Sequence, residues 1–111
     1  MHELWLCQNI MEIVKQQAAN YTQVKTINLE MGKLAAIDKA ALIFSFDVVK
    51  NGTIAEHAVL NIVEINPKAW CKACQKNFAI SQYYDPCPYC NGHVLKITQG
   101  EELQIKSIEV E

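Results

Sequence analysis

Several features that mark other classes of protein are missing from this sequence. Its 111 residues contain no apolar run near the length of a membrane span, and the first residues lack the basic region and apolar stretch of a signal peptide. Basic residues are not in excess, because 12 acidic side chains outnumber 10 Lys and Arg and the formal net charge is −2. A nucleic-acid groove normally needs a basic face. These absences argue against a membrane protein and a nucleic-acid partner, and they favour a cytoplasmic protein.

The chain is short but rich in apolar residues and in cysteine. Half of its residues are hydrophobic, which supports one ordinary domain, or a small core that carries a metal-stabilised appendage. Five cysteines are present, and four of them fall between residues 71 and 90. Thiols stay reduced in the cytoplasm, so this cluster indicates metal binding before disulfides.

Two helices are predicted in the first half of the chain. Apolar residues recur at three- and four-residue steps from Leu4 to Ala19 with polar residues between them, which is typical of an amphipathic helix. A second helix is expected to begin at Asp38, a favourable N-cap, and to stop at the pair Asn51-Gly52. This helix is expected to bury four apolar side chains, those of Leu42, Ile43, Phe46 and Val49.

Three main strands are predicted around these helices. The stretch "QVKTINLEMG" alternates apolar and polar residues and ends at Gly32. Residues 58–65 are nearly all Val, Ile and Leu, which predicts a strand covered on both faces or central in its sheet. The closing "LQIKSIEVE" also alternates, but the pattern slips by one residue around Lys106 and Ser107, and a β-bulge would account for the slip.

Composition changes between Pro67 and Gly100, where cysteines, aromatics and prolines gather and helical periodicity disappears. This segment looks like an insertion whose ends return to the same sheet. We therefore predict an α+β fold in which residues 1–66 and 100–111 form an α/β domain of two helices on a three-stranded sheet. Residues 67–99 are predicted to form an inserted, small zinc-ribbon-like domain.

The strongest motif in the chain is a pair of Cys-x-x-Cys turns, "CKAC" and "CPYC", separated by twelve residues. Two such turns can surround one Zn²⁺ with a tetrahedron of thiolates from Cys71, Cys74, Cys87 and Cys90. A closed set of four thiolates leaves no position for a substrate water, so the expected role of the zinc is structural. His93, three residues beyond Cys90, is a candidate second-shell donor, and a surface position in the turn is the alternative.

Other interpretations of the cysteines remain open. A redox Cys-x-x-Cys pair would follow a strand and begin a helix, and neither pair does so in the predicted elements. A redox-labile zinc site is a second alternative. A nucleic-acid-binding zinc ribbon has only four lysines to offer near the turns, namely Lys68, Lys72, Lys76 and Lys96. A hydrolytic zinc enzyme would need an open zinc position, so no enzyme activity is expected.

The chain begins "MHEL", and this start offers several nitrogens to one metal ion. The α-amine of Met1, the deprotonated amide of His2 and its imidazole Nδ1 can form fused chelate rings, and planar nitrogen coordination suits Ni(II) or Cu(II). Spacing alone leaves this open, because a solvated helix start with Glu3 at its positive end explains the same residues. On the same helix, Cys7 is expected to be a buried thiol.

Taken whole, the sequence resembles the HypA/HybF family of nickel-insertion accessory proteins for [NiFe]-hydrogenase maturation, and within it the HybF-like members. The matching features are the "MHEL" start, "LEMGKL" leading to "IDKAALIFSFDVV", "GT" before an apolar strand, the two Cys-x-x-Cys turns and the closing "IKSIEVE". They extend from one end of the chain to the other.

The resemblance implies a nickel metallochaperone with two metal sites. Ni(II), the transferred cargo, would bind at Met1, His2 and Glu3, with Asp38 as an accessory ligand or simply a helix cap. A structural Zn(II) would bind the four cysteines. The resemblance further implies delivery to the hydrogenase large subunit in concert with the GTPase HypB, and some members serve urease. The expected oligomeric state is a monomer or a weak homodimer.

Overall fold

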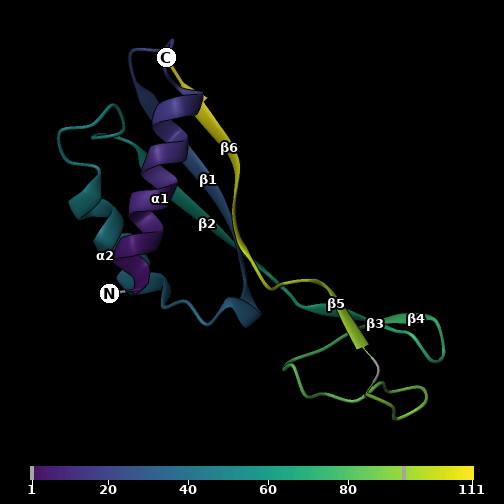
Figure 1. Cartoon of the computed structure of the whole chain (residues 1–111). Helices are drawn as coiled ribbons and strands as arrows, with labels where there is room; N and C mark the ends of the chain where they lie inside the picture. The colour runs from purple at the N-terminus through teal and green to yellow at the C-terminus, as the bar shows by residue number, and fades with distance from the viewer. Residues whose placement is uncertain (1, 94) are drawn as a thin grey trace. The chain divides into compact units, whose positions relative to one another are not determined.

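The structure is a computed structural model that describes residues 2–93 and 95–111. Within these residues the chain forms two α-helices, one short 3-10 helix and six β-strands (Figure 1). In chain order they are α1 (His2–Gln17), β1 (Val24–Gly32), η1 (Lys33–Ala35), α2 (Lys39–Val49), β2 (Val59–Ile65), β3 (Lys68–Cys71), β4 (Lys76–Ala79), β5 (Leu95–Gln99) and β6 (Leu103–Val110). Neither α-helix of the described chain has the length and apolar content needed to cross a membrane.

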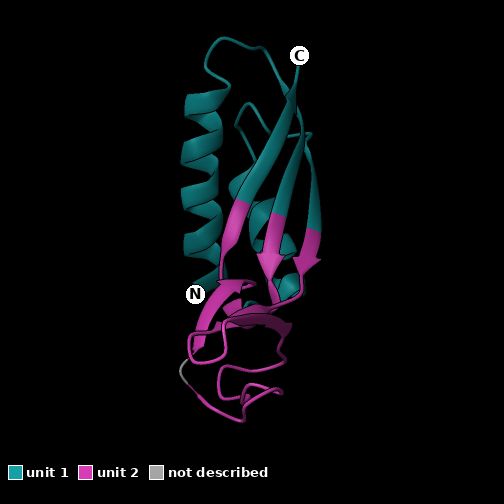
Figure 2. Ribbon diagram, turned by 90° about the vertical axis from the view of Figure 1, so that its right-hand side faces the viewer, with its two compact units in different colours: residues 1–29, 37–62, 105–111 teal, residues 30–36, 63–104 magenta. Residues whose placement is uncertain are grey.

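The strands form two three-stranded sheets, with the orders β2-β1-β6 and β4-β3-β5. The chain divides into two compact units, residues 1–29, 37–62 and 105–111 in the first and residues 30–36 and 63–104 in the second (Figure 2). Both α-helices belong to the first unit, and the second sheet belongs to the second. The predicted α+β fold is thereby confirmed. The domain limits predicted from composition, with residues 67–99 inserted, stay a prediction.

Helix α1 packs against the first sheet and α2 through one apolar stripe. Its buried residues are spaced three and four apart, as an amphipathic helix requires: Cys7, Ile10, Met11 and Val14. The Cys7 Sγ donates a hydrogen bond to the Leu42 carbonyl oxygen of α2 at 3.3 Å. The burial predicted for Cys7 is therefore confirmed, and the helix starts and ends two residues before its predicted limits.

Helix α2 begins and ends where the sequence predicts. The Asp38 carboxylate accepts a hydrogen bond from the Ala41 amide at 3.1 Å, and the chain turns at Gly52, whose φ of 74° lies in the left-handed region. The prediction that α2 buries Ile43 is wrong, because this side chain is 39% exposed. Both helices lie on the same face of the first sheet (Figures 1 and 2), so α2 buries only its inner stripe and Ile43 falls on its flank.

Strand β2 is an edge strand, contrary to the expectation of a central or doubly covered one. Val59 and Val63 are 59% and 54% exposed, because the helices cover only one face of the sheet. On the first unit's part of the other face the side chains of three strands form a polar ladder. The Asn61 Nδ2 donates to the Asn28 Oδ1 at 3.1 Å, and the Asn28 Nδ2 donates to the Ser107 Oγ at 3.0 Å.

Candidate metal centre

Two turns of the second unit present the four cysteines. Strand β3 ends at Cys71 and pairs with β4 so that Cys71 lies opposite Lys76, which makes the first Cys-x-x-Cys turn the loop of a hairpin. In this turn the Gln75 amide donates to the Cys71 carbonyl oxygen at 2.8 Å, and in the second turn the Asn91 amide donates to the Cys87 carbonyl oxygen at 2.8 Å. The two turns therefore close with the same hydrogen bond.

The residue that follows each turn adopts a left-handed backbone. Gln75 has a φ of 56° and Asn91 a φ of 60°. A left-handed residue reverses the chain tightly after the second cysteine, which lets both sulphurs of a turn point to the same side. The "NG" pair after Cys90 signals such a turn in the sequence. Nothing in the sequence signals it at Gln75.

The four sulphurs converge on one point. All ligand atoms of Cys71, Cys74, Cys87 and Cys90 lie within 4.8 Å of one another. The nearest pairs join the two turns, with 3.6 Å between Cys71 Sγ and Cys90 Sγ and 3.5 Å between Cys74 Sγ and Cys87 Sγ. A tetrahedron with Zn–S bonds of about 2.3 Å has S–S edges of about 3.8 Å. The thiol geometry thus fits a four-coordinate zinc, and it provides no nitrogen or carboxylate ligand.

Burial gives the cysteine group one closed side and one open side. Cys71 and Cys87 are buried, Cys74 is half-buried and Cys90 is exposed. The two buried cysteines are part of a small core with Ala69, Phe78 and Ile80, and Leu34 of η1 packs against it. Leu34 precedes the predicted insertion by more than thirty residues, so sequence reasoning missed its contribution.

Backbone amides near the sulphurs favour the charged form of one thiol. The Cys74 amide, as the largest influence, lowers the pKa of Cys71 to about 7, against a smaller contribution from burial. Burial, followed by the hydrogen bond with Cys87, raises the pKa of Cys74 to about 12. At Cys90 the Gly92 amide acts to lower the pKa, but hydrogen bonds with the neighbouring sulphurs and burial leave it raised. One thiolate is therefore accessible near neutral pH, as metal ligation requires.

His93 is exposed and stands outside the converging group of sulphurs. Its backbone carbonyl accepts a hydrogen bond from the Leu95 amide at 3.0 Å, which leads the chain into β5. Gly92 is more directly involved than His93, because its carbonyl oxygen accepts from the Cys87 amide at 2.9 Å. A second-shell role for His93 stays a prediction.

The residues predicted for nickel lie in the first unit, except for Met1, which falls outside the described residues. His2 is exposed and starts α1, so its amide precedes the first hydrogen-bonded turn. Glu3 is half-buried, and after burial itself its carboxylate is the second cause that raises the pKa of Cys7 to about 11. Among the described residues no metal-ligating group forms around His2, Glu3 or Asp38. Trp5, 60% exposed, lies one helical turn from His2.

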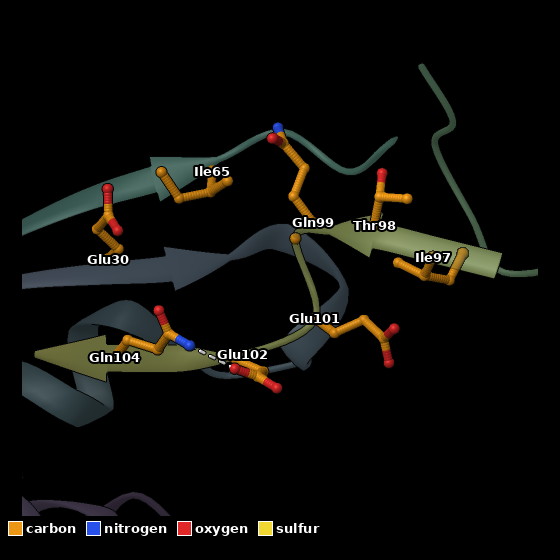
Figure 3. Close-up of a pocket in the computed structure, with 9 residues that line it drawn as sticks. Glu30, Ile65, Ile97, Thr98, Gln99, Glu101, Glu102 and Gln104 are labelled. Atoms are coloured by element: carbon orange, nitrogen blue, oxygen red, sulfur yellow. Dashed lines mark hydrogen bonds between the residues drawn. The ribbon is translucent and has the colours of Figure 1, made fainter. Parts of the chain in front are cut away.

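A hollow of about 420 Å³ in the second unit is lined by carboxylates and apolar side chains (Figure 3). Its acidic residues are Glu30, Glu101 and Glu102. Gln104 donates a hydrogen bond to Glu102, and the Tyr83 hydroxyl donates to Glu101 at 3.3 Å. In the described part of the chain only the cysteines bring three or more ligating atoms together, so the cysteine group is the candidate metal centre.

Comparison with known proteins shows one family along the whole chain. The family described as "Hydrogenase/urease nickel incorporation, metallochaperone, hypA" matches residues 1–110. The hydrogenase maturation factor HypA of Legionella pneumophila strain Lens is 54% identical over 113 residues, and that of Azotobacter vinelandii is 43% identical over 113 residues. Each alignment covers 100% of both chains.

Solved structures of similar fold point in the same direction. The solution structure of the Ni metallochaperone HypA from Helicobacter pylori matches with a TM-score of 0.75 at 22% identity, covering 97% of this chain and 96% of that one. A second solution structure of a HypA protein matches with a TM-score of 0.78 at 23% identity, covering 100% and 97%. At these identities the likeness shows the fold. Together with the sequence relatives, it establishes that the chain belongs to the HypA family of nickel-incorporation metallochaperones for hydrogenase and urease.

Proposed function

We propose that this protein binds Ni(II) as cargo at its N-terminal Met1-His2-Glu3 sequence and delivers it to the large subunit of a [NiFe]-hydrogenase during maturation. The observation that carries the proposal is the family match over residues 1–110, which includes this start. Relatives of full length named hydrogenase maturation factors favour hydrogenase as the destination. The GTPase HypB is the proposed assisting partner.

The position of His2 at the first residue of α1 supports nickel binding through backbone nitrogen. The first amides of a helix have no intrahelical acceptor, so a metal can take the deprotonated His2 amide without breaking a helical hydrogen bond. A deprotonated amide is negative, and the positive end of the helix dipole favours that charge. The amine of Met1 and the His2 imidazole would complete the chelate.

Glu3 and Asp38 contribute less directly in this proposal. The Glu3 carboxylate is close enough to the Cys7 thiol to influence its pKa, four residues along the same helix face. The Asp38 carboxylate already caps α2 through the Ala41 amide. We therefore assign Glu3 a role through its backbone or in partner contact, and Asp38 the role of a cap.

Two ligand chemistries would keep the cargo apart from the structural ion. Four thiolates in a tetrahedron suit Zn²⁺, whereas a plane of nitrogens suits Ni(II). The four cysteines would hold zinc permanently, because they share the small core of the second unit. The N-terminal nitrogens lie at an exposed helix start, where protonation of His2 or displacement of the amine at a partner's interface can release nickel.

The proposal is tested by titrating untagged protein with Ni(II) in a calorimeter while zinc content is measured. Replacement His2→Ala, or an added residue in front of Met1, is expected to lower nickel affinity by at least tenfold, a loss of about 1.4 kcal/mol. Both changes should leave one zinc per chain, because they lie outside the cysteine group.

Two further variants act as controls in the same titration. Cys74→Ser is expected to lose zinc and to retain N-terminal nickel binding, and Asp38→Asn is expected to retain both. Unchanged nickel affinity in folded His2→Ala protein would contradict the proposed cargo site. Stoichiometric zinc in Cys74→Ser protein would contradict the four-thiolate site.

A further inference from the structure

Strand β6 forms one border of the first sheet (Figure 1), and in the described chain its outer side has no partner strand. Such a side presents backbone N–H and C=O groups that another strand can pair with. Beside it, within the first unit, lies a hollow of about 280 Å³ between α1 and β6. Ile13, Val14, Ile105 and Ile108 line its apolar part, and Ile13 is 47% exposed. This border is therefore open in both its backbone and its apolar side chains.

The burial of β6 is the same in both directions along the strand. Four residues are half-buried and four are exposed, in the order half-buried, exposed, half-buried, exposed, exposed, half-buried, exposed, half-buried from Leu103 to Val110. The order is symmetric because the alternation slips at Lys106 and Ser107, which are exposed in succession. An antiparallel copy of the strand can therefore match every position only when Lys106 lies opposite Ser107. Any other register sets exposed residues opposite half-buried ones.

We propose that β6 pairs antiparallel with β6 of a second copy of this chain, about a two-fold axis between Lys106 and Ser107. The pairing places Ile105 of each copy opposite Ile108 of the other, next to the hollow that Ile13 lines. It joins two sheets into one of six strands, in the order β2-β1-β6-β6-β1-β2. The two-fold axis makes the interface self-complementary, as closed dimers require.

Charges along β6 agree with this register. In antiparallel strands a side chain also reaches the residue two positions from its direct partner. Lys106 would lie opposite Ser107 and diagonally next to Glu109 of the second copy, and the axis repeats this pair. Both side chains are exposed, and the ion pairs found among the described residues involve neither of them. The second copy would thus supply each with an opposite charge.

The same features disfavour other strands as partners. A lysine and an interruption of the alternation on an edge strand are devices that prevent unspecific pairing. Only a strand that carries a matching interruption and an acidic residue at the right distance satisfies them, and β6 itself is such a strand. Because the contact consists of one short strand pair and an apolar hollow, it belongs among small, weak interfaces.

The test is sedimentation equilibrium of the full-length, zinc-loaded protein from micromolar to millimolar concentration. The wild type is expected to form dimers as the concentration rises. Lys106→Glu and Glu109→Lys each replace two attractive diagonal pairs by repulsive ones, so each is expected to weaken the dimer about tenfold. The double variant Lys106→Glu with Glu109→Lys restores opposite charges and should recover the wild-type dimer.

Lys15→Glu on the exposed face of α1 is the matched control, because it reverses a lysine that lies away from β6 and should leave the dimer unchanged. Circular dichroism verifies that every variant is folded. A wild type that stays monomeric to millimolar concentration overturns the proposal. So does a dimer that withstands both single reversals, or one that the double variant fails to restore.

Discussion

Gln75 and Asn91 occupy equivalent positions in the two cysteine turns but differ in how well they tolerate them. Each follows the second cysteine of its turn, has a left-handed backbone and donates its amide to the first cysteine's carbonyl oxygen. Asparagine visits this conformation more readily than glutamine, whose Cβ crowds the following carbonyl. The first turn therefore holds the more strained residue of the two.

Glycine at position 75 is expected to stabilise the zinc-loaded second unit. Gln75→Gly removes the Cβ that the left-handed backbone disfavours, and the entropy gained by the unfolded chain offsets part of this, so the expected gain is about 0.5–1 kcal/mol. Denaturant unfolding at a fixed free zinc concentration measures it. Asn91→Gly should gain less. An equal gain in Gln75→Ala, which keeps the Cβ, would show that the backbone conformation is not the cause.

At the residue scale the sequence predicts ligand types better than it predicts their support. Spacing alone brings the four cysteines together, because a Cys-x-x-Cys turn is local geometry. Leu34 packs against their core from far away in the sequence, and Gly92 supports Cys90 through its backbone. Neither contact leaves a pattern in the sequence, since one depends on tertiary packing and the other on a main-chain group.

The end of β1 and the start of β6 meet at unusually close range in the second unit. The Gly32 amide donates to the Glu102 carbonyl oxygen at 2.9 Å, and the Leu34 amide donates to the Gly100 carbonyl oxygen at 2.9 Å. A Cβ placed on Gly32 would lie 2.2 Å from the carbonyl carbon of Gly100. Gly32 itself has an ordinary φ of −67°, so only space, and not backbone conformation, requires a glycine there.

Gly32→Ala is therefore expected to destabilise the protein by about 2–3 kcal/mol, since backbone atoms must move to admit the methyl group. Thermal or denaturant unfolding of the zinc-loaded protein measures the loss. Gly52→Ala is the matched control, because Gly52 has a φ of 74° but no atom within 4 Å of the added Cβ. It should cost only about 1 kcal/mol. A cost for Gly32→Ala no larger than this would contradict the close approach.

At the element scale, helix limits follow from the sequence and strand positions do not. Caps and turns such as Asp38 and Gly52 are local signals, and α2 lies within them. The apolar run of β2 predicts a strand, but an apolar run cannot tell an edge from a centre, and β2 lies at an edge with Val59 exposed. Its place depends on which strands pair, and that is decided by the whole chain.

The two compact units differ in what stabilises them. The described core of the first unit contains large apolar side chains from both helices and the sheet, including Met11, Val14, Leu42 and Phe46. The second unit has a buried cluster of five residues, Ala69, Cys71, Phe78, Ile80 and Cys87, two of which are candidate metal ligands. A core so small depends on a bound metal for much of its stability.

Removal of zinc by a chelator is accordingly expected to unfold the second sheet and to leave the helical layer folded. Hydrogen exchange followed by mass spectrometry should show lost protection in β3, β4 and β5, and retained protection in α1 and α2. Nickel-free protein is used, so that the chelator acts on one ion. Loss of protection in the helices at the same chelator concentration would mean that the chain unfolds as one cooperative body, and it would reject residues 67–99 as an independent domain.

The chain carries two indoles, Trp5 on α1 near His2 and Trp70 on β3, 60% and 37% exposed. Each belongs to a different compact unit. Replacing one of them by phenylalanine leaves a single natural fluorophore, so light emission can follow the cargo end and the cysteine end of the protein separately, without any added dye.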